Sequence, residues 1–286
     1  MKLRIVTGDR LIEYINKPNR AIRQMILNAR HINQMVFENI KQPPPYGIDQ
    51  IILELNSTNI FYPYQIIRIP NLQQSGLLRL TPSGFLISIS SEESINRQNF
   101  SIAHEIGHSL FYNFSKNPPS PPLKHIDNKM EEQMCNIFAA ELLLPEKYLR
   151  KMWDEHINET TLQEINLLAS ILGTSVYTLL LQVKFYNIHI LNNKIIVVFQ
   201  GKINENDDTL IGMIDFILPK NNMLSLVKNE ICKLILPINK LEKLYKSPIE
   251  MLWIYNNNRY VFCTEIKPYG SFFTLAILSI DNDGFK

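Results

Sequence analysis

The chain lacks the features that mark secreted and membrane-spanning proteins. Its three cysteines, Cys135, Cys232 and Cys263, are odd in number and form neither a C-x-x-C pair nor a disulfide framework. No apolar run approaches the roughly 18 residues that a membrane helix needs. The first 20 residues carry scattered charges and no apolar core of a signal peptide. We therefore expect a cytoplasmic protein.

The chain also lacks an excess of charge of either sign. Its 29 Lys and Arg residues nearly balance 27 Asp and Glu residues, for a net charge of +2. Such a balance gives no general attraction to nucleic acid or to a membrane surface, so we expect neither as a partner. The apolar share of 45% is typical of globular proteins, and 286 residues predict about two domains.

The most informative stretch reads H-E-x-x-H, from His104 to His108. On a helix, His104 and His108 lie one turn apart on the same face, where two imidazoles can bind one metal ion. Glu105 stands beside them and can act on water at that ion. The pattern is short, so its value depends on a helix and a third ligand in the surroundings.

A helix is predicted from about Ile95 to Tyr112. Ser91 to Ser94 offer residues that cap a helix N-terminus. Apolar positions then recur with helical spacing, at residues 100, 103, 107 and 110. Gly107 costs such a helix about 1 kcal/mol relative to Ala, which we interpret as a sign that another backbone or a ligand approaches closely.

A third ligand must come from elsewhere in the chain. A metzincin would have Gly and His at the positions of Phe111 and Phe114, so that type is excluded. A second predicted helix, residues 131–144, places small residues on the same face as Glu132 and can pack tightly on the first. Glu132 is the preferred candidate. The rivals are Glu131, Glu141 and His125.

The remaining sequence divides into four predicted parts. Residues 1–45 form a basic helical segment, with a helix between Arg20 and Ile40 that docks on the main domain or contacts an acidic partner or nucleic acid. Residues 46–150 hold the H-E-x-x-H motif, a helix at 48–55 and a strand at 64–69. A hairpin of residues 77–80 and 85–90 follows. Its half-polar second arm is either an exposed edge that receives an extended peptide or an ordinary core strand.

Residues 151–186 resemble a helix-turn-helix unit, with helices at 161–172 and 176–184. The second helix is mostly apolar, which favours a structural or partner-docking role over DNA binding. Residues 187–286 read as a small α+β domain. Its strands are predicted at 195–200, 213–218, 260–266 and 272–279, and its helices at 224–234 and 238–246.

Two blocks of this sequence resemble the ImmA/IrrE family of bacterial metallo-endopeptidases. They are F-S-I-A-H-E-I-G-H-S-L at residues 100–110 and E-x-x-C-N-x-F-A-A-E-L-L-L-P at residues 132–145. The resemblance covers about residues 45–150. It implies an α+β, zincin-like protease domain with a small antiparallel sheet. It also implies that His104, His108 and Glu132 bind the metal and that Glu105 is the catalytic base.

The same resemblance implies a function. The metal would be Zn²⁺, with Mn²⁺ or Fe²⁺ left open, and the substrate a helix-turn-helix transcriptional repressor whose cleavage releases stress or mobile-element genes. The C-terminal part would resemble a GAF-type sensor. Tyr112 and His125 are candidates for stabilising the oxyanion. The alternatives are a non-catalytic partner-binding module with a structural metal, and a DNA-binding regulator.

Overall fold

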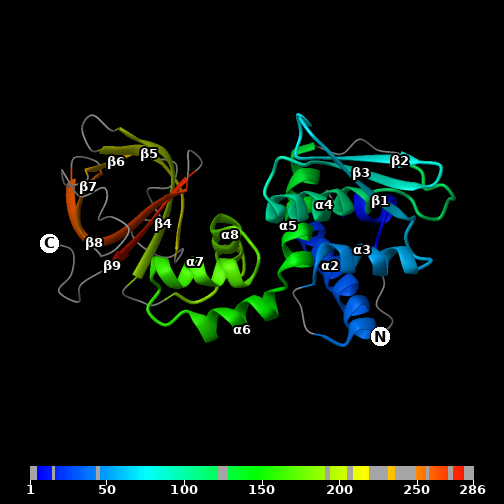
Figure 1. Cartoon of the computed structure of the whole chain (residues 1–286), viewed down its shortest axis with the longest axis horizontal. Helices are drawn as coiled ribbons and strands as arrows, with labels where there is room; N and C mark the ends of the chain where they lie inside the picture. The colour runs from blue at the N-terminus through cyan, green and yellow to red at the C-terminus, as the bar shows by residue number, and fades with distance from the viewer. Residues whose placement is uncertain are drawn as a thin grey trace. The chain divides into compact units, whose positions relative to one another are not determined.

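The computed structural model describes residues 5–14, 17–42, 46–121, 128–190, 194–204, 209–218, 231–235, 249–255, 258–269 and 273–279. The chain divides into two compact units (Figure 1). The first comprises residues 1–151 with 172–175, and the second comprises residues 152–171 with 176–286. Helices and small sheets alternate along the chain, which confirms the predicted α+β class.

The first unit is built on helices that wrap one apolar core. They are α1 (Asp9–Ile12), α2 (Pro18–Ile40), α3 (Ile48–Ser57), α4 (Ile95–Ser109), α5 (Asn128–Leu143) and the start of α6 (Glu146–His156). Pro18 opens α2 at a position where a helix needs no backbone N–H. The buried face of α2 includes Met25, Ala29 and Ile32 at helical spacing, and the helix packs against α3 and α5.

The sheet of the first unit has the strand order β1-β3-β2. Its strands are β1 (Tyr64–Ile69), β2 (Gly76–Thr81) and β3 (Gly84–Ser90). β2 runs antiparallel to β3, but β1 runs parallel to it, so the sheet is mixed rather than antiparallel throughout. The interpretation of residues 85–90 as an exposed edge is wrong, because β3 pairs on both sides. Its serines Ser88 and Ser90 are buried, and the outer strands are β1 and β2.

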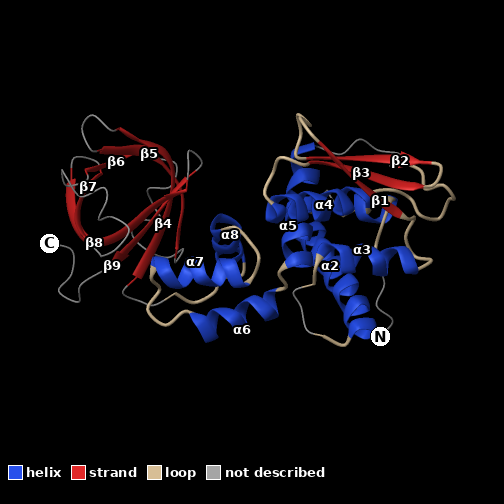
Figure 2. Cartoon of the chain, in the orientation of Figure 1, coloured by secondary structure: helices blue, strands red, loops and turns tan. Residues whose placement is uncertain are grey.

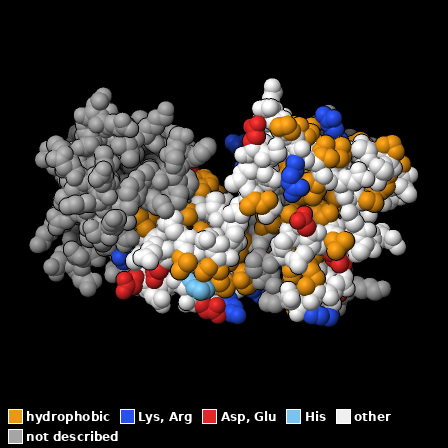
Figure 3. Space-filling view, viewed as in Figure 1, with side chains coloured by type: hydrophobic (Ala, Val, Ile, Leu, Met, Phe, Trp, Pro, Cys, Tyr) orange, Lys and Arg blue, Asp and Glu red, His pale blue; other side chains and the backbone are white. Residues whose placement is uncertain are grey.

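Helix α4 packs against β2 and β3 (Figure 1). The hydroxyl of Ser94 accepts a hydrogen bond from the backbone N–H of Arg97 at 3.4 Å and so caps the first turn. Ile102 and Ile106 of α4 are fully buried in the same core as Phe85 and Ile87 of β3. On the face drawn in Figure 3, apolar side chains of this unit lie among polar and charged ones.

Besides the end of α6, the described part of the second unit contains two helices and a closed antiparallel sheet (Figure 2). The helices are α7 (Leu162–Ile171) and α8 (Val176–Phe185). The strands are β4 (Lys194–Asn204), β5 (Thr209–Leu218), β6 (Ile231–Ile235), β7 (Ile249–Tyr255), β8 (Asn258–Tyr269) and β9 (Phe273–Ser279). Each strand pairs with the next, and β9 pairs with β4 to close the sheet. The Tyr177 hydroxyl of α8 donates to Asp215 Oδ2 of β5 at 2.6 Å.

The prediction of a helix at residues 224–234 is wrong for residues 231–234, which belong to β6. A short apolar run fits either structure by itself, and here pairing with β5 and β7 decides. Residues 224–230 and the helix predicted at 238–246 lie outside the described residues. The analogy with a GAF-type sensor is not confirmed.

Among the described helices, none is by itself long and apolar enough to cross a membrane. Helices α7 and α8 meet the criteria of length and composition only as a pair, which is bent by 96°.

Candidate metal centre

Helix α4 presents His104 and His108 one turn apart, as the helical spacing predicts. Their Nε2 atoms lie 3.0 Å from each other. Both side chains are mostly buried, with 13% and 18% of their surface exposed. The two imidazoles therefore form a preformed pair at one point of the helix surface.

Glu132, near the start of α5, completes a group of three that could hold a metal ion. Its Oε2 lies 3.1 Å from His104 Nε2, and its Oε1 lies 3.3 Å from His108 Nε2. One ligand atom from each of the three residues fits within 4.8 Å of the others. The sequence prediction had placed the same three residues together.

Gly107 explains how α5 comes close enough to α4. A Cβ at position 107 would lie 3.2 Å from Cys135 Cα and 3.2 Å from Phe138 Cδ1, both on α5. The close approach of a second backbone, predicted from the cost of a glycine inside the helix, is thus confirmed. The thiol of Cys135 is buried between these helices, and burial raises its pKa.

The outer nitrogen of each imidazole contacts a side-chain oxygen of α5. Asn136 Oδ1 lies 2.9 Å from His104 Nδ1, and Glu131 Oε1 lies 2.7 Å from His108 Nδ1. These oxygens accept hydrogen bonds, so each Nδ1 carries the proton and each Nε2 keeps a lone pair directed at the other. Sequence reasoning named no such partner for either ring. The available signal was that Asn136 follows Glu132 by one helical turn.

The chemistry of this donor set fits a divalent metal ion. Two imidazole lone pairs and a carboxylate converge within 3.3 Å of one another, and all of them are acceptors. Acceptors at such short distances repel one another, and a proton on one Nε2 removes the repulsion in only one of these contacts. A cation relieves all of them at once, and two imidazoles with one carboxylate are a common ligand set for Zn²⁺ with an open position.

The electrostatic environment differs between the two imidazoles. Burial lowers the pKa of His104, and the neighbouring His108 lowers it further. For His108, burial again lowers the pKa, but the hydrogen bond to Glu131 and the charge of Glu105 outweigh it, so the net direction is upward. Glu131 thus biases His108 towards holding positive charge.

Glu105 lies beside the imidazoles with its side chain directed at the sheet. It is 7% exposed, and its carboxylate accepts a hydrogen bond from the backbone N–H of Leu78 on β2. Burial raises the pKa of Glu105 to about 6, against the opposing effects of His108 and of the Leu78 hydrogen bond. The carboxylate lines a cavity of about 680 Å³ between β2, α4 and the start of α5.

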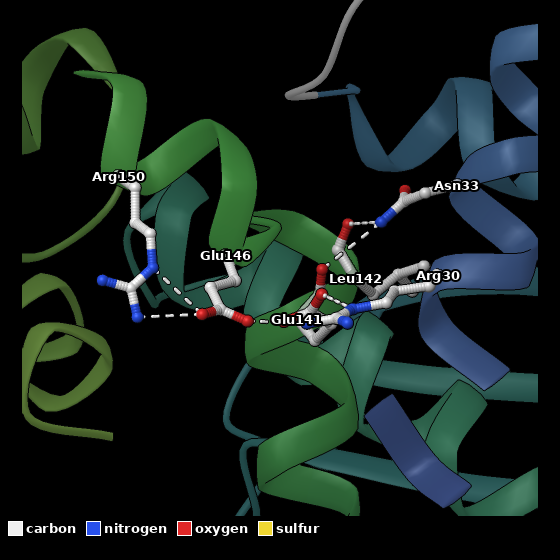
Figure 4. A network of polar contacts seen from close by, with 6 residues as sticks. All are labelled: Arg30, Asn33, Glu141, Leu142, Glu146 and Arg150. Carbon is white, nitrogen blue, oxygen red and sulfur yellow. Dashed lines mark hydrogen bonds and ion pairs between the residues drawn. The ribbon is translucent and has the colours of Figure 1, made fainter. Parts of the chain in front are cut away.

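The rival third ligands have other surroundings. Glu141, near the opposite end of α5, lies 2.7 Å from Arg30 Nε (Figure 4). Arg30 also contacts Glu146, whose other carboxylate oxygen pairs with Arg150. Asn33 donates to two backbone carbonyls at the end of α5. This network fixes the helix that carries Glu132 at the end remote from the imidazoles.

Three other residues were candidates from the sequence, as a metal ligand or as a partner of the oxyanion: Glu131, Tyr112 and His125. Glu131 contacts His108 through the outer nitrogen, on the side away from the converging lone pairs. Tyr112 lines the cavity, and its ring meets Phe85 edge-on at a centroid distance of 5.1 Å. His125 lies outside the described residues.

Comparison with known proteins agrees with this architecture. Residues 64–181 match the profile of the IrrE N-terminal-like domain, a peptidase family. A solved structure of a Mycobacterium tuberculosis transcriptional regulator resembles the chain with a TM-score of 0.52 and 12% sequence identity, over 94% of this chain and 80% of that chain. At that identity the likeness concerns the fold alone. No curated protein matches the sequence. The segment that matches the profile contains both H-E-x-x-H and Glu132, so this part of the chain is similar to the IrrE N-terminal-like peptidase domain.

Proposed function

We propose that the protein is a Zn²⁺-dependent endopeptidase that cleaves a specific protein partner. His104, His108 and Glu132 bind the ion, and Glu105 is the general base. The observation that carries the proposal is the convergence of three acceptor groups beside the Glu105 carboxylate in one cavity. Ligands of mixed nitrogen and oxygen type also accept Mn²⁺ and Fe²⁺.

The residues around the cavity divide the work of amide hydrolysis. When bound, the metal supplies Lewis acidity, which lowers the pKa of water and polarises a carbonyl group. Glu105 takes the proton of the attacking water on a carboxylate oxygen and returns it to the nitrogen of the leaving amine. Asn136 and Glu131 keep the imidazoles in the orientation that directs Nε2 inward.

The outer strand β2 supplies a surface for the substrate. Gly76, Leu77 and Leu78 line the cavity, and β2 lies at the margin of the sheet. An extended peptide that adds to this margin as a further strand runs past Glu105 and the imidazoles. Strand addition holds the main chain in one orientation, which places a single peptide bond at the centre.

We infer that the substrate is a helix-turn-helix transcriptional repressor, whose cleavage releases stress or mobile-element genes. Two findings support this choice of partner: the family match and the likeness to a protein described as a transcriptional regulator. Direct DNA binding by α7 and α8 is less favoured. These helices contain one cation, Lys184, while Leu181 and Phe185 of α8 are partly exposed.

Metal analysis is the first test of the proposed centre. Purified protein should retain about one equivalent of Zn²⁺ in the wild type and in Glu105→Gln, and should lose it in Glu132→Ala. Glu105→Gln preserves shape while removing the base. Unchanged metal content in Glu132→Ala would overturn the assignment of the third ligand.

Cleavage is tested on soluble extract of the host cell. Wild type loaded with Zn²⁺ should create new protein N-termini, detected by terminal labelling and mass spectrometry, at one site or very few. Glu105→Gln should create none, because general base catalysis contributes about 10² to 10⁴ in rate. Equal release of a partner by both proteins, without new termini, would instead support the non-catalytic module.

A further inference from the structure

Gly76, on the outer strand β2, faces the Glu105 carboxylate at unusually short range. A Cβ at position 76 would lie 2.6 Å from Glu105 Oε1, 3.1 Å from its Cγ and 3.2 Å from its Cδ. Real Cβ atoms do not approach other heavy atoms to 2.6 Å. The Glu105 side chain therefore occupies the volume that any other residue at position 76 would fill.

The register of the sheet shows why this position faces α4. Gly76, Leu78 and Leu80 alternate along β2 opposite Ile89, Ile87 and Phe85 of β3. These three β3 side chains are fully buried in the core. Side chains of alternate residues share one face of a sheet. Positions 78 and 80 thus carry leucines on the face where position 76 leaves room for a carboxylate.

The backbone of Gly76 does not itself require glycine. Its φ lies outside the left-handed region, in contrast to Gly84, whose φ is 155°. An alanine at position 76 can adopt the same backbone conformation, and the three atoms nearest to its Cβ all belong to the Glu105 side chain. Moving the end of that side chain breaks the hydrogen bond from Leu78, so it costs folding free energy and changes where the carboxylate lies.

We propose that Gly76 is a positioning residue for Glu105. The missing side chain lets the carboxylate lie against the margin of β2, where the backbone N–H of Leu78 donates to it. Strand β2, which orients the substrate, thereby also fixes the position of the Glu105 carboxylate. The substrate and the general base are therefore both positioned by the same strand. The geometric claim stands on the structure, and its catalytic consequence rests on the proposed function.

The geometric claim is tested without any activity, by thermal unfolding of full-length protein in the presence of EDTA. Gly76→Ala is made in the wild type and in Glu105→Ala. With the carboxylate removed, alanine should raise Tm, because glycine in a strand loses more backbone entropy on folding. With Glu105 present, the collision should abolish or reverse that increase. Equal shifts of Tm in both backgrounds would overturn the proposal.

A matched control is Gly47→Ala, where the new Cβ meets only Gln50 Oε1, at 3.7 Å. Its shift of Tm should be the same with and without the Glu105 carboxylate. A difference between backgrounds as large as that for Gly76 would show that the Glu105 variant is not a local change, and the claim for Gly76 would fall.

The catalytic consequence is tested with a peptide spanning the bond cleaved in host extract. Gly76→Ala should lower kcat about 100-fold, as expected for a misplaced catalytic group. KM and Zn²⁺ content should stay as in the wild type, because no ligand moves. Wild-type kcat in Gly76→Ala, with kcat lost in Glu105→Gln, would overturn the positioning role alone. Retained kcat in Glu105→Gln would instead overturn the proposed function.

Discussion

Each imidazole of the centre is held through both of its nitrogens. The outer nitrogen of His104 contacts Asn136 and that of His108 contacts Glu131, while the inner nitrogens face each other at 3.0 Å. Without the outer contacts each ring could rotate or exchange tautomers, and the pair would present a lone pair only part of the time. Metal affinity therefore depends on residues that need not touch the metal.

The first prediction concerns these two outer contacts. Asn136→Ala and Glu131→Ala should each weaken Zn²⁺ binding by about 10- to 100-fold, the usual cost of removing such a partner. Competition with a fluorescent chelator measures the affinity. The control is Gln133→Ala, an exposed position on the same helix, which should bind Zn²⁺ like the wild type. Wild-type affinity in both variants would contradict the role given to these residues.

The second prediction concerns Gly107. Alanine would favour the helix by about 1 kcal/mol, but its Cβ would lie 3.2 Å from the Cα of Cys135, and a helix backbone yields less readily than a side chain. Overpacking costs about 1–3 kcal/mol, so Gly107→Ala should lower the free energy of unfolding by about 1 kcal/mol. It should also weaken Zn²⁺ binding, because the displaced α5 carries Glu132. Urea unfolding measures the change in stability, and metal titration measures the change in Zn²⁺ affinity. A gain in stability in Gly107→Ala would contradict the prediction.

Helix α5 is the element that joins the metal centre to the rest of the first unit. Its N-terminal part carries Glu131, Glu132 and Asn136, while Glu141 near its end pairs with Arg30 of α2. The side chain of Glu141 is 1% exposed, whereas that of Arg30 is 41% exposed. Because the Glu141 carboxylate is buried, losing its contact with Arg30 is costly.

The third prediction follows from that contact. Arg30→Ala should lower the free energy of unfolding by about 3 kcal/mol, at the lower end of the cost of breaking a buried ion pair by removing one partner. We expect a cost at the lower end of this range because the Arg30 side chain is half-exposed. Arg23→Ala, an exposed arginine on the same helix, should change stability by less than about 0.5 kcal/mol. Equal effects of the two substitutions would contradict the contribution of the Glu141 contact.

The fourth prediction concerns the start of α7, where Thr161 and Glu164 cap each other. The Glu164 amide donates to Thr161 Oγ1 at 3.2 Å, and Glu164 Oε2 accepts from the Thr161 amide at 3.0 Å. Partial burial acts to raise the pKa of Glu164, but hydrogen bonds from the backbone of Thr161, Asn158 and Glu159 outweigh it and lower the pKa below 4.5.

A lowered pKa in the folded state means that the stabilisation is complete above the unfolded pKa and is lost as pH falls through the folded one. Glu164→Ala should therefore cost about 1 kcal/mol near pH 7, and the difference from the wild type should shrink below pH 4.5. Urea unfolding at several pH values measures this. Glu159→Ala removes the same charge from an exposed position nearby and is the matched control. A loss of stability near pH 7 as large as that of Glu164→Ala would contradict the role of the cap.

The sequence predicted those residues of the candidate site whose positions follow from helical periodicity. His104, Glu105 and His108 share one helix, and Gly107 signalled the approach of α5 through its own cost. Asn136 lies one helical turn after Glu132, yet its contact with His104 depends on how two helices pack, which periodicity does not specify. Nothing in the sequence indicated the role of Gly76, because a glycine at the start of a strand is common. Its role becomes visible only when Glu105 of α4 is found to lie against it.

The elements missed or misplaced have the same physical cause. The half-polar pattern of Phe85 to Ser90 left an exposed edge and a core strand open, and the parallel partner β1 on that side of β3 decides for the core strand. In β6, the run from Ile231 to Ile235 is too short to distinguish a strand from a helix, and the pairing with β5 and β7 determines the outcome. Both outcomes depend on contacts between segments distant in sequence.

For the whole molecule, the residues of the candidate site all belong to one unit. The cavity is lined by residues between Gln74 and Asn136, which lie within the first unit. The second unit has its own buried residues, such as Leu168 of α7 and Ile196 of β4. Metal binding should therefore stabilise the first unit directly, by RT ln(1 + [Zn²⁺]/Kd).

The stabilisation of the first unit by Zn²⁺ can be measured as a rate of alkylation of Cys135, because alkylation needs an exposed thiol. Its side chain is buried where α4 and α5 meet, so iodoacetamide reaches it only while that packing is open. As the fifth prediction, Zn²⁺ at 100 times its Kd should slow modification of the Cys135 peptide about 100-fold, measured by mass spectrometry. An unchanged rate would mean that the thiol is exposed by motions that leave the metal centre intact. The rate of a single chemical label thus reports how often the bound ion is released by opening of the protein around it.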